Sequence, residues 1–418
     1  MRTDRRMHAL CFQMAAPADP DARPLSTADA GRHRATRPLR AVVAGGGTGG
    51  HLFPGIAVAE EIRGRDPRHP VLFISRGNAF ERSALARAGF PLEPIAVEGL
   101  KGRGRWDQVR ALTRLPQAVA QSVCRLREFR PDLVVGLGSY SAGPVVLAAW
   151  LLRIPIALCE QNTLPGITNR VLARLADRIF IAFERTVGGF DPGKTRWTGN
   201  PLRREIVNAA AAGAIGGAAV ASDPHRPFTV LVLGGSQGAH RVNTAVVEAL
   251  DHLADRRRFF FIHQTGPADE AMAAAAYARS GTAARVQAFF TDMAVQYLGA
   301  DLVVCRAGAT TVAEITALGK AAVFIPFPFA ADDHQRLNAR RMVDAGAAEM
   351  IDEQELTGAQ LGARIGFYAS HPEALAGLAG QAARLGKPNA ARHIVDECYR
   401  LVAERASRKP ADGPTGDR

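Results

Sequence analysis

Residues 45–51, GGGTGGH, place five glycines, a threonine and a histidine directly after an apolar run. Glycine carries no side chain, so a ligand can approach the main chain of such a turn, and the N–H groups at the start of a following helix attract phosphate or another polar group. Three of these glycines also have the GxGxxG spacing of a dinucleotide-binding turn. That fingerprint requires an acidic residue about 20 residues further on, where this sequence has Arg76. An NADP-type site that uses Arg76 stays open as an alternative.

Two further glycine turns follow apolar runs. Residues 233–243, LGGSQGAHRVN, repeat the order of strand, glycines, a hydroxyl group (Ser236) and helix. Residues 305–319, CRAGATTVAEITALG, place small residues and two threonines at the start of a helix, with Glu314 about one turn inside. The positive N-terminal end of that helix suits a diphosphate leaving group, and Glu314 could accept two hydrogen bonds from a ribose diol. An acid favoured only by the helix dipole is the alternative interpretation of Glu314.

Two polar clusters complete the set of candidate residues. Residues 326–340 contain Asp332, Asp333, His334, Gln335 and Asn338. Adjacent residues rarely converge on one metal ion, so this cluster is interpreted as one that recognises sugar hydroxyl groups, and no metal is expected. The second cluster follows another apolar run and comprises Glu160, Gln161 and Asn162.

Two successions of strands and helices must position these residues. The predicted strands of the first are residues 39–45, 70–75, 131–138, 154–160 and 177–183, and those of the second are 228–236, 257–266, 284–290, 300–308 and 321–328. Strands that alternate with helices form mainly parallel sheets covered on both faces, so the sequence predicts an α/β protein of two doubly wound domains. Ligands bind beyond the carboxyl ends of such strands. One glycine turn per domain therefore indicates a ligand held across a cleft.

Composition sets the predicted domain boundaries. We expect a disordered extension at 1–38, an N-terminal domain at 39–208, a small-residue linker at 209–226, a C-terminal domain at 227–404 and a disordered tail at 405–418. The last helices of the second domain are allowed to pack back on the first. The first segment is too broken for the apolar core of a signal peptide.

Charge, cysteine content and hydropathy exclude several classes of protein. The net charge of +12 invites a nucleic-acid partner, but half of the excess lies in the two tails, so none is predicted. Five scattered cysteines without a CxxC pair indicate reduced thiols in the cytoplasm. The longest apolar run, 145–152, is far shorter than the ~20 residues of a membrane-spanning helix.

The motifs GGGTGGHLFPGIAVAE, GSYSAGPVVLAAWLLRIPIALCEQNTLPGITNR, TGNPLR, LGGSQGAHRVN, CRAGATTVAEI and DDHQRLNA resemble, in order, those of a peptidoglycan glycosyltransferase family, the undecaprenyl-diphosphate-muramoylpentapeptide β-N-acetylglucosaminyltransferases. The resemblance spans roughly residues 39–400. It implies a GT-B architecture, in which two Rossmann-like domains face each other across a cleft. It also implies an inverting transfer of GlcNAc from UDP-GlcNAc to the C4 hydroxyl of the muramoyl sugar of lipid I, giving lipid II.

The resemblance further implies which residues bind the substrates. On the N-terminal side these are Thr48, Gly49, Gly50, Asn162 and Arg203. On the C-terminal side they are Ser236, Phe290 through main-chain contacts with uracil, Ala309, Thr310, Thr311, Val312, Ala313 and Glu314 around the diphosphate and ribose, and Gln335 or His334 at the GlcNAc hydroxyl groups. Arg306 and the helix that starts near Ala309 are expected to meet the charge of the leaving group without a metal or other cofactor.

Two residues are candidates for the general base. His51 is the first, because imidazole is the side chain that ordinarily changes charge near neutral pH and this one follows a glycine turn. Glu160 is the second, and a His51 that only hydrogen-bonds the backbone or the acceptor is the alternative interpretation. The chain departs from the family at Cys159, where the family often has histidine. That position is therefore expected to be supportive.

Because lipid I is a membrane lipid, we expect peripheral attachment to the anionic cytoplasmic face of the inner membrane, with cell-wall and division proteins as further partners. Residues 98–130 mix basic and apolar side chains, namely Lys101, Arg103, Arg105, Arg110, Arg114, Trp106, Leu112 and Leu115. Such a surface can bind anionic lipid, and a solvated helix face is the alternative. Two other functions stay open at this point: a UDP-GlcNAc 2-epimerase of the same fold, and a non-catalytic sugar-nucleotide-binding subunit.

Overall fold

The computed structural model describes residues 38–47, 49–97, 105–184, 186, 189–216, 226–235, 238–330 and 333–407. The predicted extension and tail, apart from Pro38 and residues 405–407, lie outside these ranges, as do Thr48 and Ser236.

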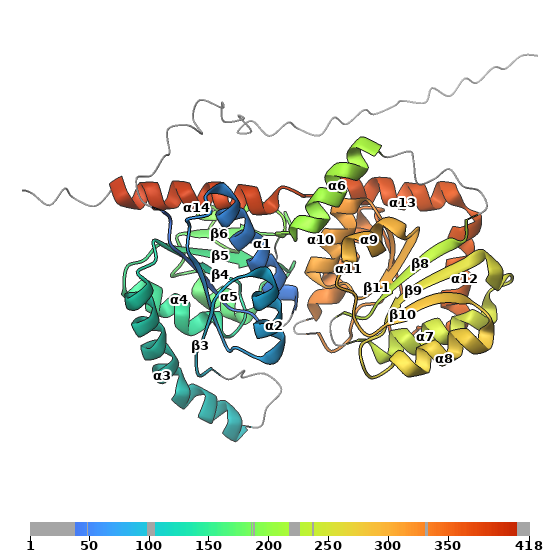
Figure 1. Cartoon of the computed structure of the whole chain (residues 1–418), viewed down its shortest axis with the longest axis horizontal. Coiled ribbons are helices and arrows are strands. Elements are labelled where there is room, and N and C mark those ends of the chain that lie inside the picture. The colour runs from blue at the N-terminus through green and yellow to red at the C-terminus, as the bar shows by residue number, and fades with distance from the viewer. Residues whose placement is uncertain are drawn as a thin grey trace, which may run out of the picture. The chain divides into compact units, whose positions relative to one another are not determined.

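A seven-stranded parallel sheet in the order β3-β2-β1-β4-β5-β6-β7 forms the centre of the first domain (Figure 1). Its strands are β1 (Ala41–Ala44), β2 (Val71–Ser75), β3 (Leu92–Pro94), β4 (Leu133–Gly136), β5 (Ile156–Glu160), β6 (Arg178–Ile181) and β7 (Thr195–Trp197). In β1, Ala41 and Val43 pack into the core on one face, whereas Val42 and Ala44 pack into the core on the other. The strand is a continuous apolar run because both faces of the sheet are covered.

Five helices of the first domain lie between these strands in the chain. They are α1 (Gly49–Arg65), α2 (Ala79–Ala88), α3 (Arg105–Phe129), α4 (Ala142–Leu151) and α5 (Ile167–Leu172). Leu52 of α1 and Leu85 of α2 belong to the core on one face of the sheet, whereas Val145 of α4 and Leu172 of α5 belong to the core on the other. Among the described residues, no helix combines the length and the apolar character needed to cross a bilayer.

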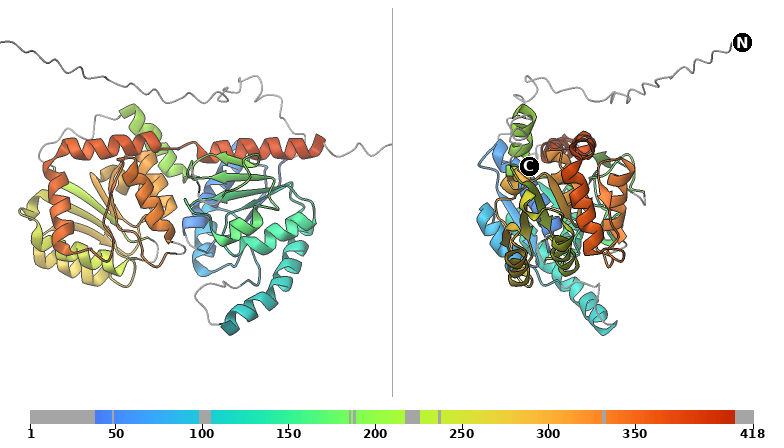
Figure 2. Two further views of the ribbon diagram at one scale, coloured as in Figure 1. Left: turned by 180° about the vertical axis from the view of Figure 1, so that it is seen from behind. Right: turned by 90° about the vertical axis from the view of Figure 1, so that its right-hand side faces the viewer.

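The second domain repeats this arrangement around a six-stranded parallel sheet in the order β10-β9-β8-β11-β12-β13. Its strands are β8 (Phe228–Leu233), β9 (Phe259–Gln264), β10 (Ala283–Gln287), β11 (Leu302–Cys305), β12 (Ala321–Phe324) and β13 (Glu349–Met350). Its helices are α7 (His240–Ala249), α8 (Glu270–Ser280), α9 (Met293–Gly299), α10 (Ala309–Leu318), α11 (His334–Asp344), α12 (Gly358–Ser370) and α13 (Pro372–Leu385). Helices cover both faces of each sheet in the views of Figure 2. The prediction of two doubly wound α/β domains is confirmed.

Helix α6 (Arg204–Gly216) belongs by its packing to the second domain. Leu202 and Ile206 lie in the same core as side chains of α9, α10 and α11. The linker predicted over 209–226 is therefore helical at its start. Alanine has the highest helix propensity of all residues, so the alanine run extends α6 instead of ending it.

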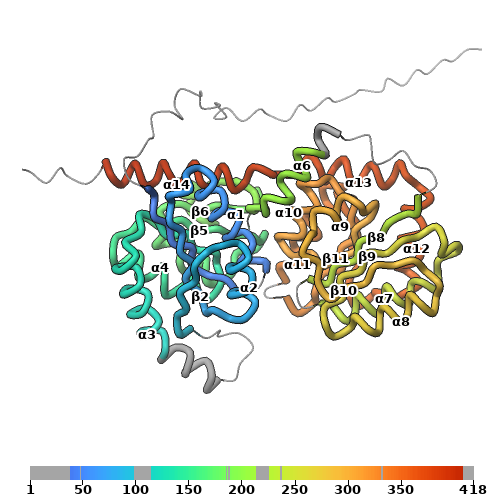
Figure 3. Tube along the Cα trace, viewed as in Figure 1, coloured from blue at the N-terminus to red at the C-terminus, as the bar shows by residue number. Residues whose placement is uncertain are grey.

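Helix α14 (Ala390–Ser407) packs on the first domain, although it follows the second domain in the chain. Ile394, Cys398 and Leu401 belong to the core that also contains Leu52 and Leu85. Figure 3 traces α14 along the side of the first sheet, near β5 and β6. The chain therefore passes between the two domains twice, once before α6 and once before α14.

Each sheet has a point at which the strand order reverses, between β1 and β4 in the first and between β8 and β11 in the second. Loops that leave neighbouring strands at such a point diverge and open a crevice for a ligand. The glycine turn 45–51 follows β1, and the third turn follows β11. The fold therefore brings both turns to the position where ligands bind in this type of sheet.

Candidate functional site

His51 lies half-buried in the first turn of α1. Its Nδ1 atom is 2.9 Å from the main-chain oxygen of Leu137, which follows β4, and 3.0 Å from Oε1 of Gln161, which follows β5. The Leu137 oxygen can only accept a hydrogen bond, so Nδ1 carries the proton and donates it. In the neutral ring the lone pair then lies on Nε2, which is the atom that can accept a proton.

Glu160, the second candidate base, is 3% exposed and binds four donors, which belong to the loop that follows it and to α5. Oε1 accepts from the main-chain and side-chain nitrogens of Asn162 at 2.9 and 3.4 Å. Oε2 accepts from the Gly166 amide at 3.1 Å and from Nδ2 of Asn169 at 2.9 Å. These four donors fill acceptor sites of the carboxylate and fix the loop. This geometry disfavours Glu160 as the base.

Cys159, the residue at which the sequence departs from the family, points into the core of the first domain. Its side chain is 2% exposed and packs in the same cluster as Cys398 of α14. Burial raises the pKa of the Cys159 thiol to about 12. The side chain at this position therefore packs against neighbours and has no access to a substrate.

The first three glycines of the turn after β1 have their N–H groups bound within the protein. The Gly45 amide donates to the Ile74 oxygen at 3.0 Å, and the Gly46 amide donates to Oγ of Ser139 at 3.0 Å. The Gly47 amide donates to Oε1 of Glu81 at 2.5 Å, and the Glu81 side chain is fully buried. Because the Glu81 carboxylate occupies the Gly47 amide, this donor is not free for the pyrophosphate of a dinucleotide. This geometry disfavours the dinucleotide hypothesis, with or without Arg76.

The N-terminal end of α10 adjoins that of α1. Gly308 caps α10 without a side-chain hydrogen bond, so the first amides of the helix have no side-chain cap. Oγ1 of Thr310 donates to the main-chain oxygen of Gly50 at 3.1 Å. Both helices direct their positive ends toward this contact, and two such ends repel each other unless an anion lies between them. The arrangement is suited to hold a diphosphate next to His51.

Glu314 lies one turn along α10 and is 5% exposed. Its Oε1 forms an ion pair with Nη2 of Arg203 at 2.8 Å. Its Oε2 accepts a hydrogen bond from the Tyr297 hydroxyl at 3.0 Å. Burial raises the pKa of Tyr297 well above its usual value, so this hydroxyl stays protonated and donates. The Arg203 guanidinium also lies 4.9 Å from the ring centre of Phe53 in α1. Arg203 thus links Glu314 to the helix that carries His51.

Asn338 of α11 connects the loops of the two domains and was not among the predicted substrate-binding residues. It is fully buried, its Oδ1 accepts the Thr163 amide at 3.1 Å, and its Nδ2 donates to the Ala307 oxygen at 3.2 Å. Its Nδ2 also lies 3.4 Å from Oδ1 of Asn162. The sequence placed Asn338 in a polar cluster for sugar hydroxyl groups, whereas the structure assigns it to the contact between domains. The signal in the sequence was its spacing, because a residue one helical turn after Gln335 lies on the same face of the helix as Gln335.

Arg306 does not extend freely toward the start of α10. Its Nη1 lies 2.5 Å from Oε2 of Glu353 and donates to the main-chain oxygens of Ile325 and Pro326 at 3.0 and 3.2 Å. Burial lowers the pKa of the Arg306 guanidinium, and the pair with Glu353 opposes that effect. The charge of Arg306 is therefore balanced inside the second domain, and this geometry does not support a role in meeting the charge of a leaving group.

Two other residues that were predicted to contact the substrate already use one polar group each in a hydrogen bond within the protein. The Phe290 amide donates to Oε1 of Gln264 at 3.0 Å, and its side chain is fully buried, so its carbonyl is the main-chain group left for uracil. Oε1 of Gln335 accepts the Phe327 amide at 3.0 Å, which leaves the Gln335 amide nitrogen as its donor for a ligand. His334 lies beside it, half-buried, at the start of α11.

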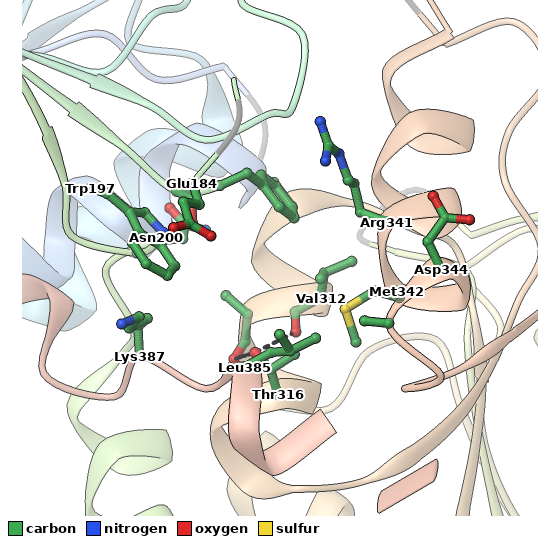
Figure 4. Close-up of a pocket in the computed structure, with 16 residues that line it drawn as sticks. Glu184, Trp197, Asn200, Val312, Thr316, Arg341, Met342, Asp344, Leu385 and Lys387 are labelled. Atoms are coloured by element: carbon green, nitrogen blue, oxygen red, sulfur yellow. Dashed lines mark hydrogen bonds between the residues drawn. The ribbon is translucent and has the colours of Figure 1, made fainter. Parts of the chain in front are cut away.

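A cavity of about 390 Å³ lies beside α10, and Glu314 is not among the residues that line it. Val312 and Thr316 line it together with Trp197 and Asn200 of the first domain (Figure 4). Ala309, Val312 and Ala313, all predicted around the diphosphate, also line this cavity, whereas Glu314 does not. Within the described ranges, no three His, Cys, Asp or Glu side chains gather as metal ligands would.

Two family models match the chain, one in each domain. The model of the glycosyltransferase family 28 N-terminal domain matches residues 41–181, and that of the family 28 C-terminal domain matches residues 229–394.

Two bacterial relatives are similar over most of their length. The UDP-N-acetylglucosamine–N-acetylmuramyl-(pentapeptide) pyrophosphoryl-undecaprenol N-acetylglucosamine transferase from Anaeromyxobacter sp. (strain Fw109-5) is 47% identical over 382 residues, which cover 90% of this chain and 98% of the relative. The protein of the same name from Myxococcus xanthus (strain DK1622) is 46% identical over 367 residues, which cover 88% of this chain and 94% of the relative.

Two solved structures have a similar fold. The crystal structure of MurG from Acinetobacter baumannii has a TM-score of 0.69 at 30% identity and covers 87% of this chain and 100% of its own. UDP-GlcNAc 2-epimerase from Neisseria meningitidis, bound to UDP-GlcNAc, has a TM-score of 0.61 with the same coverages, but at 13% identity this likeness shows the fold alone. The two parallel sheets together with the first of these structures confirm the predicted GT-B architecture.

Proposed function

This chain belongs to the family 28 UDP-N-acetylglucosamine–N-acetylmuramyl-(pentapeptide) pyrophosphoryl-undecaprenol N-acetylglucosamine transferases, and we propose that it transfers GlcNAc from UDP-GlcNAc to the C4 hydroxyl of the muramoyl sugar of lipid I, giving lipid II. One observation carries the proposal beyond family membership. The helix that bears His51 and the uncapped start of α10 meet through Gly50 and Thr310. The proposed base and the proposed anion site thus lie on neighbouring turns, as a transfer that releases a diphosphate requires.

The proposed step is a single displacement at C1 of GlcNAc. The C4 oxygen of the acceptor forms the new bond to C1 while the bond from C1 to the β-phosphate oxygen breaks. UDP leaves with the electron pair of that bond, and the proton of the acceptor hydroxyl passes to Nε2 of His51. Attack from the face opposite the leaving group gives the β1→4 linkage. A positioned base of this kind contributes about 10²- to 10⁴-fold to the rate.

The leaving group is stabilised by main-chain amides at the start of α10, in the segment Ala309–Ala313. A helix N-terminus carries about half a positive charge, which favours the diphosphate as negative charge develops on it. Glu314 is the proposed partner of the ribose hydroxyl groups, because Arg203 and Tyr297 fix the position of its carboxylate and each oxygen has a further lone pair. This scheme needs no metal ion.

The remaining contacts extend the donor and acceptor sites. We retain Gly49, Gly50 and Asn162 on the acceptor side, and the Phe290 carbonyl and the Gln335 amide nitrogen on the donor side. Thr48 and Ser236, predicted beside them, lie outside the described residues. Arg306 is left out of this scheme because Glu353 balances its charge.

Attachment to the anionic cytoplasmic face of the inner membrane is proposed through the first domain. Four apolar side chains of α4 and α5 are 50–66% exposed, namely Trp150, Leu151, Ile167 and Val171. Exposed aromatic and aliphatic side chains grouped on adjacent helices are typical of a surface that enters the lipid headgroup layer. Of the eight basic and apolar side chains predicted for this purpose, six, including Lys101, Arg103 and Trp106, lie outside the described side chains. Cell-wall and division proteins remain predicted partners.

One assay tests the function against its alternatives. Release of UDP from UDP-GlcNAc is measured in EDTA, with and without a soluble lipid I analogue. Release that depends on the analogue, with formation of the disaccharide product, supports the transferase. Release without the analogue points to an epimerase or hydrolase, and binding without release points to a non-catalytic subunit. Activity that EDTA abolishes and Mg²⁺ restores would contradict the metal-independent scheme.

A further inference from the structure

We propose that Gln161 is a positioning residue for the transfer, which together with the Leu137 carbonyl holds His51 in the tautomer whose Nε2 accepts the proton of the acceptor hydroxyl. The inference rests on the proposed function. Gln161 contacts the Nδ1 atom of His51, so its proposed contribution is to set the orientation and tautomer of the imidazole ring.

The orientation of the Gln161 amide follows from its second hydrogen bond. Nε2 of Gln161 donates to the main-chain oxygen of Cys159 at 3.2 Å, and the side chain is 2% exposed. With the amide reversed, its oxygen would face the Cys159 oxygen and its NH₂ group would face the Nδ1–H of His51. Both contacts would then be repulsive, so Oε1 is the atom that faces His51.

Two acceptors therefore share one imidazole N–H. Leu137 and Gln161 follow β4 and β5, which are paired neighbours in the sheet, so the position of both oxygens is fixed by a rigid element. Rotation of the ring by half a turn would bring a carbon atom to the two oxygens and lose both hydrogen bonds. The same bonds strengthen when His51 becomes an imidazolium, because a charged donor makes shorter and stronger hydrogen bonds. The pair thus orients the base and stabilises its protonated product.

The choice of an amide at position 161 has its own consequence. A glutamine oxygen accepts the Nδ1–H without a full negative charge, so it does not hold the resting imidazole in its protonated, inactive form. A glutamate at the same place would favour the imidazolium before the acceptor arrives. The neutral side chain at this position therefore orients the ring without adding a carboxylate charge that favours the imidazolium.

Other charged groups near the first turn of α1 have partners of their own. Glu81 accepts the Gly47 amide, Glu160 binds Asn162 and Asn169, and Arg203 pairs with Glu314. The first turns of α1 and α10 contain no acidic residue. These groups are the same in the wild-type protein and in the variants at position 161, so a change in the titration of His51 isolates the effect of Gln161.

The test uses the full-length protein with ¹⁵N-labelled histidine, and its first readout does not depend on activity. The His51 signals are identified by their absence in His51→Gln. We expect the Nδ1–H tautomer in the wild-type protein and a midpoint of protonation about one pH unit higher in Gln161→Glu. A wild-type Nε2–H tautomer, or a Gln161→Glu midpoint equal to that of the wild type, would overturn the inference.

Kinetics supply the second readout. Gln161→Leu removes one acceptor, so we expect kcat to fall about fivefold with the KM for UDP-GlcNAc unchanged, and the acidic limb of kcat/KM in Gln161→Glu to move to higher pH. The control is Asn169→Leu, which removes a bond to the same Cys159 oxygen and one to Glu160 without touching His51. It should lower stability and leave that limb in place. An equal shift of the acidic limb in Gln161→Glu and Asn169→Leu would assign Gln161 a purely structural role. If the wild-type protein shows no acceptor-dependent UDP release, the proposed function is overturned. The result with labelled histidine would still stand in that case.

Discussion

Oγ1 of Thr310 donates a 3.1 Å hydrogen bond to the main-chain oxygen of Gly50, which joins the first turn of α10 to the first turn of α1. Gly50 directly precedes His51, so this side chain of the second domain links the proposed base to the proposed diphosphate site. Nδ2 of Asn200 lies 3.4 Å from the same hydroxyl oxygen. The position of His51 relative to the proposed diphosphate site thus depends on a few polar contacts at this point.

Replacing Thr310 by valine tests that contact, because the change keeps the shape of the side chain and removes its hydroxyl. We expect kcat/KM for UDP-GlcNAc to fall about fivefold, which corresponds to the loss of one hydrogen bond of about 1 kcal/mol. Thr310→Ser keeps the hydroxyl and should restore most of the activity. Equal activity of the valine and serine variants would show that the contact with Gly50 has no part in the reaction.

Glu160→Gln separates the structural role of Glu160 from a role as base. Glutamine replaces one acceptor oxygen by an NH₂ group that faces N–H donors, so we expect the free energy of unfolding to fall by about 2 kcal/mol. The acidic limb of the pH–rate profile should stay where it is. If stability is unchanged and the acidic limb disappears, Glu160 is the base and His51 is not.

The stability of the second domain should depend on pH through His263. This side chain is fully buried, with Nδ1 3.1 Å from the Tyr277 hydroxyl and Nε2 3.1 Å from Oδ1 of Asn243, and burial lowers its pKa to about 3. Between that value and the ordinary value of 6.5, the unfolded chain binds a proton that the folded chain does not. The stability that neutral His263 contributes above its ordinary pKa is therefore lost as the pH falls. The free energy of unfolding decreases by about 1.4 kcal/mol per pH unit in this range.

Urea unfolding of His263→Gln between about pH 6 and about pH 4 measures this contribution. We expect the variant to lose stability less steeply with falling pH than the wild-type protein, by the slope given above. His252→Gln, at an exposed position, is the matched control and should keep the wild-type slope. A wild-type slope in His263→Gln would mean that His263 is protonated in the folded protein.

Binding to vesicles that contain anionic lipid tests the proposed membrane surface. Trp150 and Ile167 are 50% and 66% exposed, and removing one large apolar side chain from a lipid contact costs about 1.5–3 kcal/mol. The double variant Trp150→Glu, Ile167→Glu should therefore bind at least about tenfold more weakly. Val295→Glu changes an equally exposed apolar residue on the second domain and should bind as the wild type does. Equal loss in both proteins would refute the assignment of this surface.

The sequence predicts the central strands well, because each is an apolar run buried on both faces. It misses three edge strands, β3 (Leu92–Pro94), β7 (Thr195–Trp197) and β13 (Glu349–Met350), because they are two or three residues long and half-exposed or exposed. Short segments of this kind have no periodicity of their own, and pairing with a neighbouring strand defines them.

The site is predictable in its location and less so in its pairings. Glycine turns after β1 and β11 mark the points where the strand order reverses, so the general position of a ligand follows from the fold. The partners of Glu81, Arg306 and Asn338 are instead set by packing between distant segments. No local pattern indicates that Glu81 binds the Gly47 amide from 34 residues away, or that Arg306 pairs with Glu353.

The most direct test of the account is acceptor-dependent UDP release by His51→Gln, compared with Glu160→Gln and the wild-type protein. Glutamine can still donate to the Leu137 oxygen but cannot accept a proton. We predict that kcat of His51→Gln falls about 10²-fold or more, with UDP-GlcNAc binding unchanged, and that Glu160→Gln retains much more activity. A His51→Gln variant within a few-fold of the wild type would contradict the central claim that His51 is the base of this transferase.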